Sequence, residues 1–330
     1  MPSDQTAKMT RRSALVAGAG LLAAPAMAQS PCLYGVPATD GAKGPVVWRD
    51  LDQAQLDAAY RQESYQPHTD EVNGRLSSLS FDLRFQRGYP ERAVYGDGPD
   101  EGMDIYRADV TDAPVFVFVH GGIWLSLNAA MSGFAAEMFM DRGAHFVALD
   151  FAPVNRLGGD LALMAEQVRR GIAWVIKNAK DFGGDPDRVY LGGHSSGGHL
   201  AAVALTTDWS DHGLPADAVK GGLVMSGMYD LEPVRLSWRN AYIAFTDEME
   251  DAMSPLRHLD RINAPVVVSY GTLETPEFIR QAKEFAAALE SAGKPVELVV
   301  GSSFFHQDMW ESLGNPYGPN GRAALKMIGL

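Results

Sequence analysis

The stretch RVYLGGHSSGGHLAAVAL, residues 188–205, decides the fold. It begins as an apolar strand, ends with helical spacing, and holds GHSSG, a match to G-x-S-x-G, at residues 193–197. In this motif a serine stands on a sharp turn between a strand and a helix, and the small flanking residues let the backbones approach. The strained turn exposes the hydroxyl, and the helix dipole points at it. We therefore predict that Ser195 is a nucleophile; a glycine-rich turn without catalytic use is the alternative.

Strand and helix signals alternate on both sides of this stretch. Strands are predicted at residues 92–95, 103–107, 114–120, 145–151, 188–191, 222–226, 265–270 and 295–300. Helices are predicted at residues 51–62, 132–142, 160–180 and 276–292, and from the serine turn to about residue 206. Such alternation builds βαβ units, which predicts an α/β fold with a mainly parallel twisted sheet and helices on both faces.

The domain organisation follows from where this alternation holds. Residues 76–330 are predicted to form the catalytic domain, and residues 29–75, rich in Gly, Pro and Ala at their start, an N-terminal arm that is a candidate lid. Residues 232–259 interrupt the alternation and carry aromatic side chains, so we expect a small cap-like insertion beside the site.

The first 28 residues predict an export signal rather than part of the fold. Arg11 and Arg12 precede an apolar run over residues 15–26, and AMA at residues 26–28 is a small-x-small cleavage pattern. Paired arginines are typical of twin-arginine signals, although Ala14 stands where an aromatic residue usually follows. We expect a periplasmic or secreted protein; an ordinary secretory signal or a basic tail is the alternative.

Composition narrows the function classes. The 330-residue chain holds 28 Lys and Arg against 41 Asp and Glu, a net charge of −13, and lacks a basic cluster, so nucleic-acid binding is not expected. The predicted strands are too short to span a membrane. No metal-ligand spacing or phosphate loop occurs, so no cofactor is predicted. The single cysteine, Cys32, cannot form an intramolecular disulfide. The expected partner is a small-molecule ester, and a homodimer is left open.

A serine nucleophile needs a base and a carboxylate that orients it. On this fold the acid and then the histidine follow the serine along the chain. His306 follows the last predicted strand, and we predict that it is the base. Glu274, just after the strand at residues 265–270, is the predicted acid. Asp230, which ends the preceding strand, is the alternative acid.

The developing oxyanion needs N–H donors, and HGGIW at residues 120–124 follows a strand where such a loop is expected. We predict that the N–H groups of Gly122, Ile123 and Ser196 form the oxyanion hole, with His120 in a structural role. The residues predicted to bind the substrate are Trp124, His194, Trp238, Tyr242 and Phe305.

Five stretches, in order, resemble one family: HGGIW (120–124), GHSSGGHLAA (193–202), SGMYDLEPV (226–234), MSPLRHL (253–259) and YGTLETPEFIRQ (270–281). They are similar to the kynurenine formamidase (arylformamidase)-like branch of the α/β hydrolases, which also resembles bacterial carboxylesterases. The resemblance implies the α/β-hydrolase fold, with Ser195, Glu274 and His306 as a catalytic triad and the HGG loop as the oxyanion hole.

Two features depart from the formamidase pattern. Ile123 stands where the family usually has an aromatic residue, and the chain carries a predicted export signal, whereas tryptophan catabolism is cytoplasmic. We therefore expect a serine carboxylesterase that hydrolyses small aromatic or alkyl esters through an acyl-enzyme. An arylformamidase is the alternative, and a non-catalytic hydrolase-like binding protein is the alternative from another class.

Overall fold

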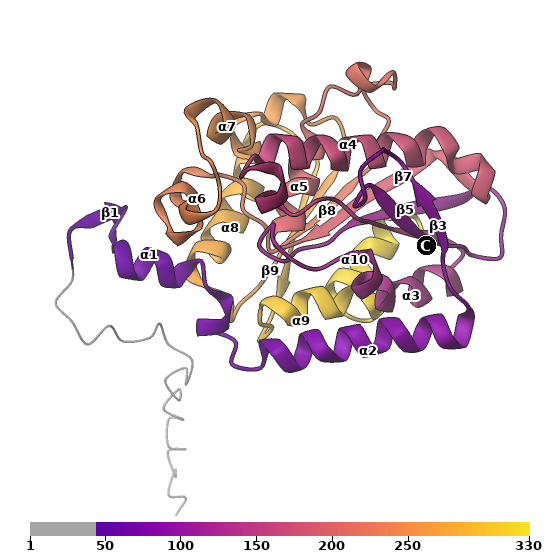
Figure 1. Cartoon of the computed structure of the whole chain (residues 1–330), viewed down its shortest axis with the longest axis horizontal. Coiled ribbons are helices and arrows are strands. Elements are labelled where there is room, and N and C mark those ends of the chain that lie inside the picture. The colour runs from indigo at the N-terminus through magenta and orange to yellow at the C-terminus, as the bar shows by residue number, and fades with distance from the viewer. Residues whose placement is uncertain (1–43) are drawn as a thin grey trace, which may run out of the picture. The chain divides into compact units, whose positions relative to one another are not determined.

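The computed structural model describes residues 44–330, and its centre is an eight-stranded sheet with helices on both faces (Figure 1). The strands are β3 (Glu91–Val94), β4 (Gly102–Tyr106), β5 (Ala113–Val119), β6 (His145–Leu149), β7 (Gly184–His194), β8 (Gly222–Met225), β9 (Val266–Gly271) and β10 (Val296–Gly301). Their order across the sheet is β10-β9-β8-β7-β5-β6-β4-β3. Only β3 with β4 and β4 with β6 pair antiparallel within this sheet. The predicted mainly parallel α/β fold is confirmed.

Alternation along the strands creates two cores, one on each face of the sheet. In β5 every residue is buried, but Val115, Val117 and Val119 belong to one apolar cluster while Phe116 and Phe118 belong to the other. Successive side chains of a strand point to opposite faces, so a fully apolar run is what a sheet covered on both faces requires.

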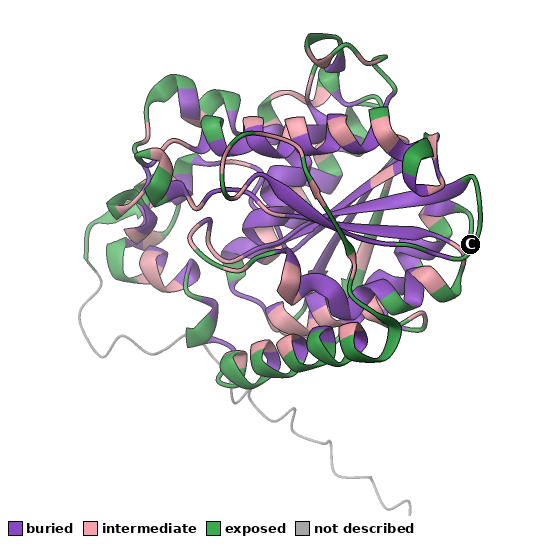
Figure 2. Cartoon of the chain, turned by 45° about the vertical axis from the view of Figure 1, so that its right-hand side comes forward, coloured by how far each residue is buried: buried purple, intermediate pink, exposed green. Residues whose placement is uncertain are grey.

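The helices cover both faces of this sheet and expose their outer surfaces (Figure 2). They are α1 (Gln53–Ala59), α2 (Thr69–Arg87), α3 (Ala136–Asp141), α4 (Leu161–Asn178), α5 (Ser196–Leu205), α6 (Glu232–Leu236), α7 (Asp247–Ala252), α8 (Pro276–Ser291), α9 (His306–Glu311) and α10 (Pro319–Ile328). Residues of α4, α5 and α8 join the first core, and residues of α2, α3 and α10 join the second. A short ribbon of β1 (Val46–Trp48) and β2 (Leu51–Asp52) precedes α1.

Helix α2 differs from the sequence prediction. The boundary predicted between residues 75 and 76 lies inside this 19-residue helix, which the apolar pattern did not reveal. Its buried residues include Val72, Leu76 and Leu83, but Phe81 and Phe85 are exposed on the same helix. Apolar residues on both sides of the helix hide its amphipathic period. The C-terminal helices α9 and α10 were not predicted either.

The cap-like insertion predicted at residues 232–259 contains α6 and α7 joined by short 3-10 turns. The predicted export signal and Cys32 lie outside residues 44–330, so the localisation stays a prediction. Among residues 44–330, no helix has the length and apolar character needed to cross a membrane.

Candidate active site

Ser195 occupies a strained turn between β7 and α5. Its backbone has φ +59° and ψ −125°, a region that non-glycine residues rarely adopt. The Ser195 N–H donates to the carbonyl oxygen of Met225 on β8 at 2.9 Å, and the Ser195 carbonyl accepts from the N–H of His199 at 3.0 Å. The turn is therefore held by the neighbouring strand on one side and by the first turn of α5 on the other.

The two glycines of the motif have no room for a side chain. A Cβ atom at Gly193 would overlap the carbonyl of Gly197, and a Cβ atom at Gly197 would overlap the carbonyls of Val119 and His120. The strand, the turn and the helix thus pack backbone against backbone. This contact is the physical reason for the glycines around Ser195.

His306 and Glu274 form a buried pair. His306 is the first residue of α9, and its Nδ1–H donates to Glu274 Oε2 at 2.8 Å. The other carboxylate oxygen, Oε1, accepts from Ser226 Oγ and from the N–H of Gly271, both at 2.6 Å. Phe278 packs edge-on against the imidazole at 5.0 Å. Both carboxylate oxygens of Glu274 are engaged, which fixes the orientation of the imidazole.

Ser195 and His306 line one cavity of about 200 Å³, together with Gly122 and Ile123. A larger hollow of about 700 Å³ next to α2 and α9 contains none of the predicted catalytic residues. The chemistry therefore places the candidate site in the smaller cavity.

The loop that follows β5, at residues 120–124, has backbone N–H groups without acceptors in the described part of the chain. Gly122, Ile123 and Trp124 have φ values of +97°, +54° and +64°. Within residues 44–330 the N–H groups of Gly122 and Ile123 donate to no other group, while the Trp124 N–H donates to Ser196 Oγ at 3.1 Å. Ser196 is the first residue of α5, where an N–H has no acceptor inside the helix. Among residues 44–330, the N–H groups of Gly122, Ile123 and Ser196 thus have no main-chain acceptor, which leaves their role as an oxyanion hole a prediction.

His120 has a structural environment. Its Nδ1–H donates to the carbonyl oxygen of Gly121 at 2.9 Å, and its ring stacks on Phe151 at 4.2 Å. Burial lowers the pKa of the His120 imidazole, which keeps the ring neutral. The residue anchors the loop rather than entering the cavity.

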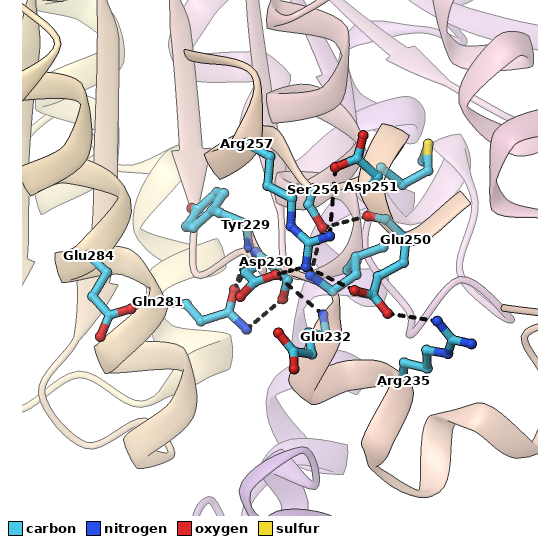
Figure 3. A network of polar contacts seen from close by, with 12 residues as sticks. Tyr229, Asp230, Glu232, Arg235, Glu250, Asp251, Ser254, Arg257, Gln281 and Glu284 are labelled. Atoms are coloured by element: carbon cyan, nitrogen blue, oxygen red, sulfur yellow. Dashed lines mark hydrogen bonds and ion pairs between the residues drawn. The ribbon is translucent and has the colours of Figure 1, made fainter. Parts of the chain in front are cut away.

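Asp230, the alternative acid, lies in a different network (Figure 3). Its Oδ1 accepts from Arg257 Nη2 at 2.9 Å and from the N–H of Glu232 at 3.3 Å. Arg257 also binds Glu250 at 2.9 Å. Asp230 thus ties the cap insertion together, and the structure brings Glu274, not Asp230, to His306.

The five residues predicted to bind substrate divide into two groups. Trp238 and His194 line the cavity. Trp124 does not, because its indole is buried in the core, edge-on to His199 at 5.2 Å. Tyr242 packs against Trp238 at 5.6 Å and is absent from the cavity wall, as is Phe305, which directly precedes α9.

His194 faces the cavity but is engaged by protein groups. Its Nε2–H donates to the carbonyl oxygen of His306 at 2.9 Å, and its ring stacks on Trp310 at 5.7 Å. Burial, with the neighbouring His306 as a second cause, lowers the pKa of His194 well below its usual range. A neutral His194 therefore holds the main chain at His306 in place.

Several cavity residues gave no recognisable signal in the sequence. They come from the N-terminal arm, the HGG loop, the cap insertion and the start of α9, and include Tyr60, Gln62, Asn73, Ser126, Arg239 and Gln307. They are polar positions on loops or near the ends of helices, where local sequence does not distinguish a cavity residue from a surface residue.

Comparisons with known proteins place the chain among the α/β hydrolases. Residues 163–310 match the prolyl oligopeptidase family, and residues 103–219 match the BD-FAE family. The chain is 30% identical over 295 residues to the kynurenine formamidase of Danio rerio, an alignment that covers 86% of this chain and 98% of that protein. The chain belongs to the kynurenine formamidase family of α/β hydrolases.

Other members and neighbours of this superfamily are esterases. This formamidase-family chain is 28% identical over 257 residues to the isoprenylcysteine alpha-carbonyl methylesterase ICME of Arabidopsis thaliana, covering 70% of this chain and 60% of that protein. Esterase LipW from Mycobacterium marinum has the same fold, with a TM-score of 0.63, 19% identity, and coverage of 82% of this chain and 90% of that one. The protein is accordingly a hydrolase of the esterase type.

Proposed function

We propose that the protein is a serine hydrolase that cleaves small carboxylic esters through an acyl-enzyme. The observation that carries this proposal is the buried pair of His306 and Glu274, with 2.8 Å between Nδ1 and Oε2, whose His306 lines the same cavity as Ser195 on its strained turn. A nucleophile, a base and an orienting carboxylate that come from three separate loops are the arrangement that acyl transfer requires.

The proposed reaction has two halves. Ser195 Oγ attacks the ester carbonyl while His306 Nε2 accepts its proton, and Glu274 stabilises the resulting imidazolium. The N–H groups of Gly122, Ile123 and Ser196 bind the oxyanion. His306 then gives the proton to the leaving alcohol, and the acyl group stays on Ser195. Water, activated by His306, attacks this acyl-enzyme and releases the acid.

Hydrolysis of 4-nitrophenyl butyrate by the wild type and by Ser195→Ala tests the nucleophile. We expect kcat to fall by at least about a thousandfold in the variant. Ser78→Ala, an exposed serine on α2, is the matched control and keeps wild-type turnover. Activity that survives in Ser195→Ala refutes the assignment. Absence of labelling by a fluorophosphonate probe supports a non-catalytic binding protein instead.

An arylformamidase is the second candidate function, and the 30% identity to the Danio rerio kynurenine formamidase over nearly its whole length favours it. The same groups would cleave an N-formyl amide: the formyl group would pass to Ser195, the amine would leave, and water would release formate. Relative kcat/KM values for an aryl ester and for N-formylkynurenine separate the two candidates. Dominant formamide cleavage would replace the carboxylesterase proposal.

A further inference from the structure

The cavity contains a buried cation that no acidic side chain neutralises. Arg239, on the 3-10 turn Trp238–Ala241 of the cap insertion, lines the cavity with only 1% of its surface exposed. Its Nη2–H donates to the carbonyl oxygen of Tyr60 at 3.2 Å. Within residues 44–330, Nε and Nη1 make no hydrogen bond, and Arg239 takes part in no ion pair with a carboxylate.

Aromatic rings surround this charge without cancelling it. The guanidinium carbon lies 5.3 Å from the ring centroid of Trp124, 5.7 Å from that of Trp238 and 5.8 Å from that of Tyr60. Cation–π contacts stabilise a cation but leave its N–H groups able to donate. The phenol of Tyr242 lies beside the guanidinium as a polar neighbour. It is neutral, because burial raises its pKa more than Arg239 lowers it, so it brings no negative charge to Arg239.

The acidic residues near the cavity are engaged elsewhere or are exposed to solvent. Both oxygens of Glu277 bind Arg280, at 2.8 and 2.7 Å. Glu63 lies on the cavity wall, but its side chain is 64% exposed and 4.0 Å from Arg61. Burying a guanidinium with unused N–H donors costs free energy unless an anion pairs with it. An anion can reach Arg239 only through the cavity that this residue lines.

We infer that Arg239 binds a carboxylate of the substrate, so that the enzyme acts on small aromatic or short-chain esters or amides that carry a free carboxylate. This inference rests on the proposed function of the same cavity. A planar guanidinium matches a carboxylate in geometry and charge. The volume of about 200 Å³ suits one ring or a short chain, and the rings of Tyr60 and Trp238 supply apolar walls.

Two pairs of esters, each differing only in charge, test the inference and place the carboxylate. The first pair is mono-4-nitrophenyl glutarate and its methyl ester, with the carboxylate on the acyl side. The second is 4-acetoxybenzoate and its methyl ester, with the carboxylate on the leaving group. For each pair, the quantity compared is kcat/KM for the anionic ester divided by kcat/KM for the neutral ester. In at least one pair we expect Arg239→Gln to lower this ratio by roughly 10- to 100-fold, mainly because KM for the anionic ester rises.

Arg235→Gln is the matched control, since Arg235 lies in the same insertion but binds Asp247 at 2.7 Å and Glu250 at 3.0 Å on the surface. Its ratio should equal that of the wild type. Arg239→Lys, which keeps the charge but loses the planar fork, should give an intermediate ratio. An unchanged ratio in Arg239→Gln for both pairs overturns the inference, because a merely structural arginine would lower both rates together.

A binding measurement separates this inference from the proposed function. In Ser195→Ala protein, calorimetric titration with phenylacetate and with phenylacetamide compares a carboxylate with its neutral isostere. We expect phenylacetate to bind at least about tenfold more tightly. If neither ester pair is hydrolysed, the proposed function fails while this titration still decides the carboxylate site. If Arg239→Gln does not fold, the same titration still tests the carboxylate site. The inference is overturned if phenylacetate does not bind, or binds no more tightly than phenylacetamide.

Discussion

Replacing Glu274 by Gln should nearly abolish turnover without changing the shape of the site. The carboxylate accepts three hydrogen bonds, two on Oε1 from Ser226 and Gly271 and one on Oε2 from His306. A glutamine has one NH₂ group, and neither orientation fits. With the NH₂ toward His306, Nδ1 must accept, so Nε2 carries the proton and cannot receive another from Ser195. With the NH₂ toward Gly271, two N–H donors face each other in a buried site.

The size of the expected loss in kcat follows from the charge of Glu274 as well as from the tautomer of His306. The carboxylate 2.8 Å from Nδ1 stabilises the imidazolium that forms in the transition state, and an amide does not. We expect kcat to fall by about 10³- to 10⁴-fold, which corresponds to about 4 to 5.5 kcal/mol in activation free energy. The folded state should persist, because the two side chains have nearly the same volume.

The assay is 4-nitrophenyl butyrate hydrolysis, with the concentration of reactive Ser195 set by fluorophosphonate titration. Asp230→Asn is the matched control, since Asp230 binds Arg257 in the cap network and should lower kcat by only a few-fold. A Glu274→Gln enzyme within tenfold of wild type would falsify the reasoning. So would a loss of the same size in Asp230→Asn, which would return the role of acid to that residue.

Two further predictions concern stability. Gly193→Ala forces a Cβ atom onto the Gly197 carbonyl and should lower the free energy of unfolding in urea titrations by about 1–3 kcal/mol. Gly74 lies on α2 with open space around the position of a Cβ atom, so Gly74→Ala should raise the free energy of unfolding by about 0.5–1 kcal/mol. Equal effects at the two positions contradict the packing argument. Burial lowers the pKa of His199 to about 4, whereas an unfolded histidine has a pKa of about 6.5. As the pH falls below about 6.5, the unfolded chain therefore binds a proton that the folded chain does not. The free energy of unfolding should fall between about pH 6.5 and pH 4, by up to roughly 3 kcal/mol. His199→Gln should show a smaller loss of unfolding free energy between about pH 7.5 and pH 5 than the wild type, and an equal loss disproves the assignment.

Much of the fold follows from local patterns. The apolar runs that became β5 and β6 were predicted within two residues at each end, because a strand buried on both faces must be continuously apolar. Helix α2 escaped prediction because Phe81 and Phe85 are apolar yet exposed. Its burial depends on contact with the second core, which local sequence cannot reveal.

The sequence by itself determined the turn at Ser195, since glycine at positions 193 and 197 and the strand-to-helix order are properties of consecutive residues. Only the tertiary structure decided which carboxylate meets His306. Glu274 and Asp230 both follow strands of a parallel sheet, so both reach the same edge, and their spacing along the chain does not distinguish them. Ser226 and Gly271 orient Glu274, whereas Arg257 draws Asp230 toward the cap insertion.

For Arg239, the tertiary structure decides even more than it does for Glu274. In the sequence it is one arginine in an irregular segment, indistinguishable from Arg235 four residues earlier. The fold exposes Arg235 to acidic partners and buries Arg239 in the cavity beside Tyr60, from the N-terminal arm. Catalytic geometry on short turns is encoded by neighbouring residues through backbone stereochemistry. The charge and shape of a cavity arise where distant segments pack together, and that packing is a property of the whole chain.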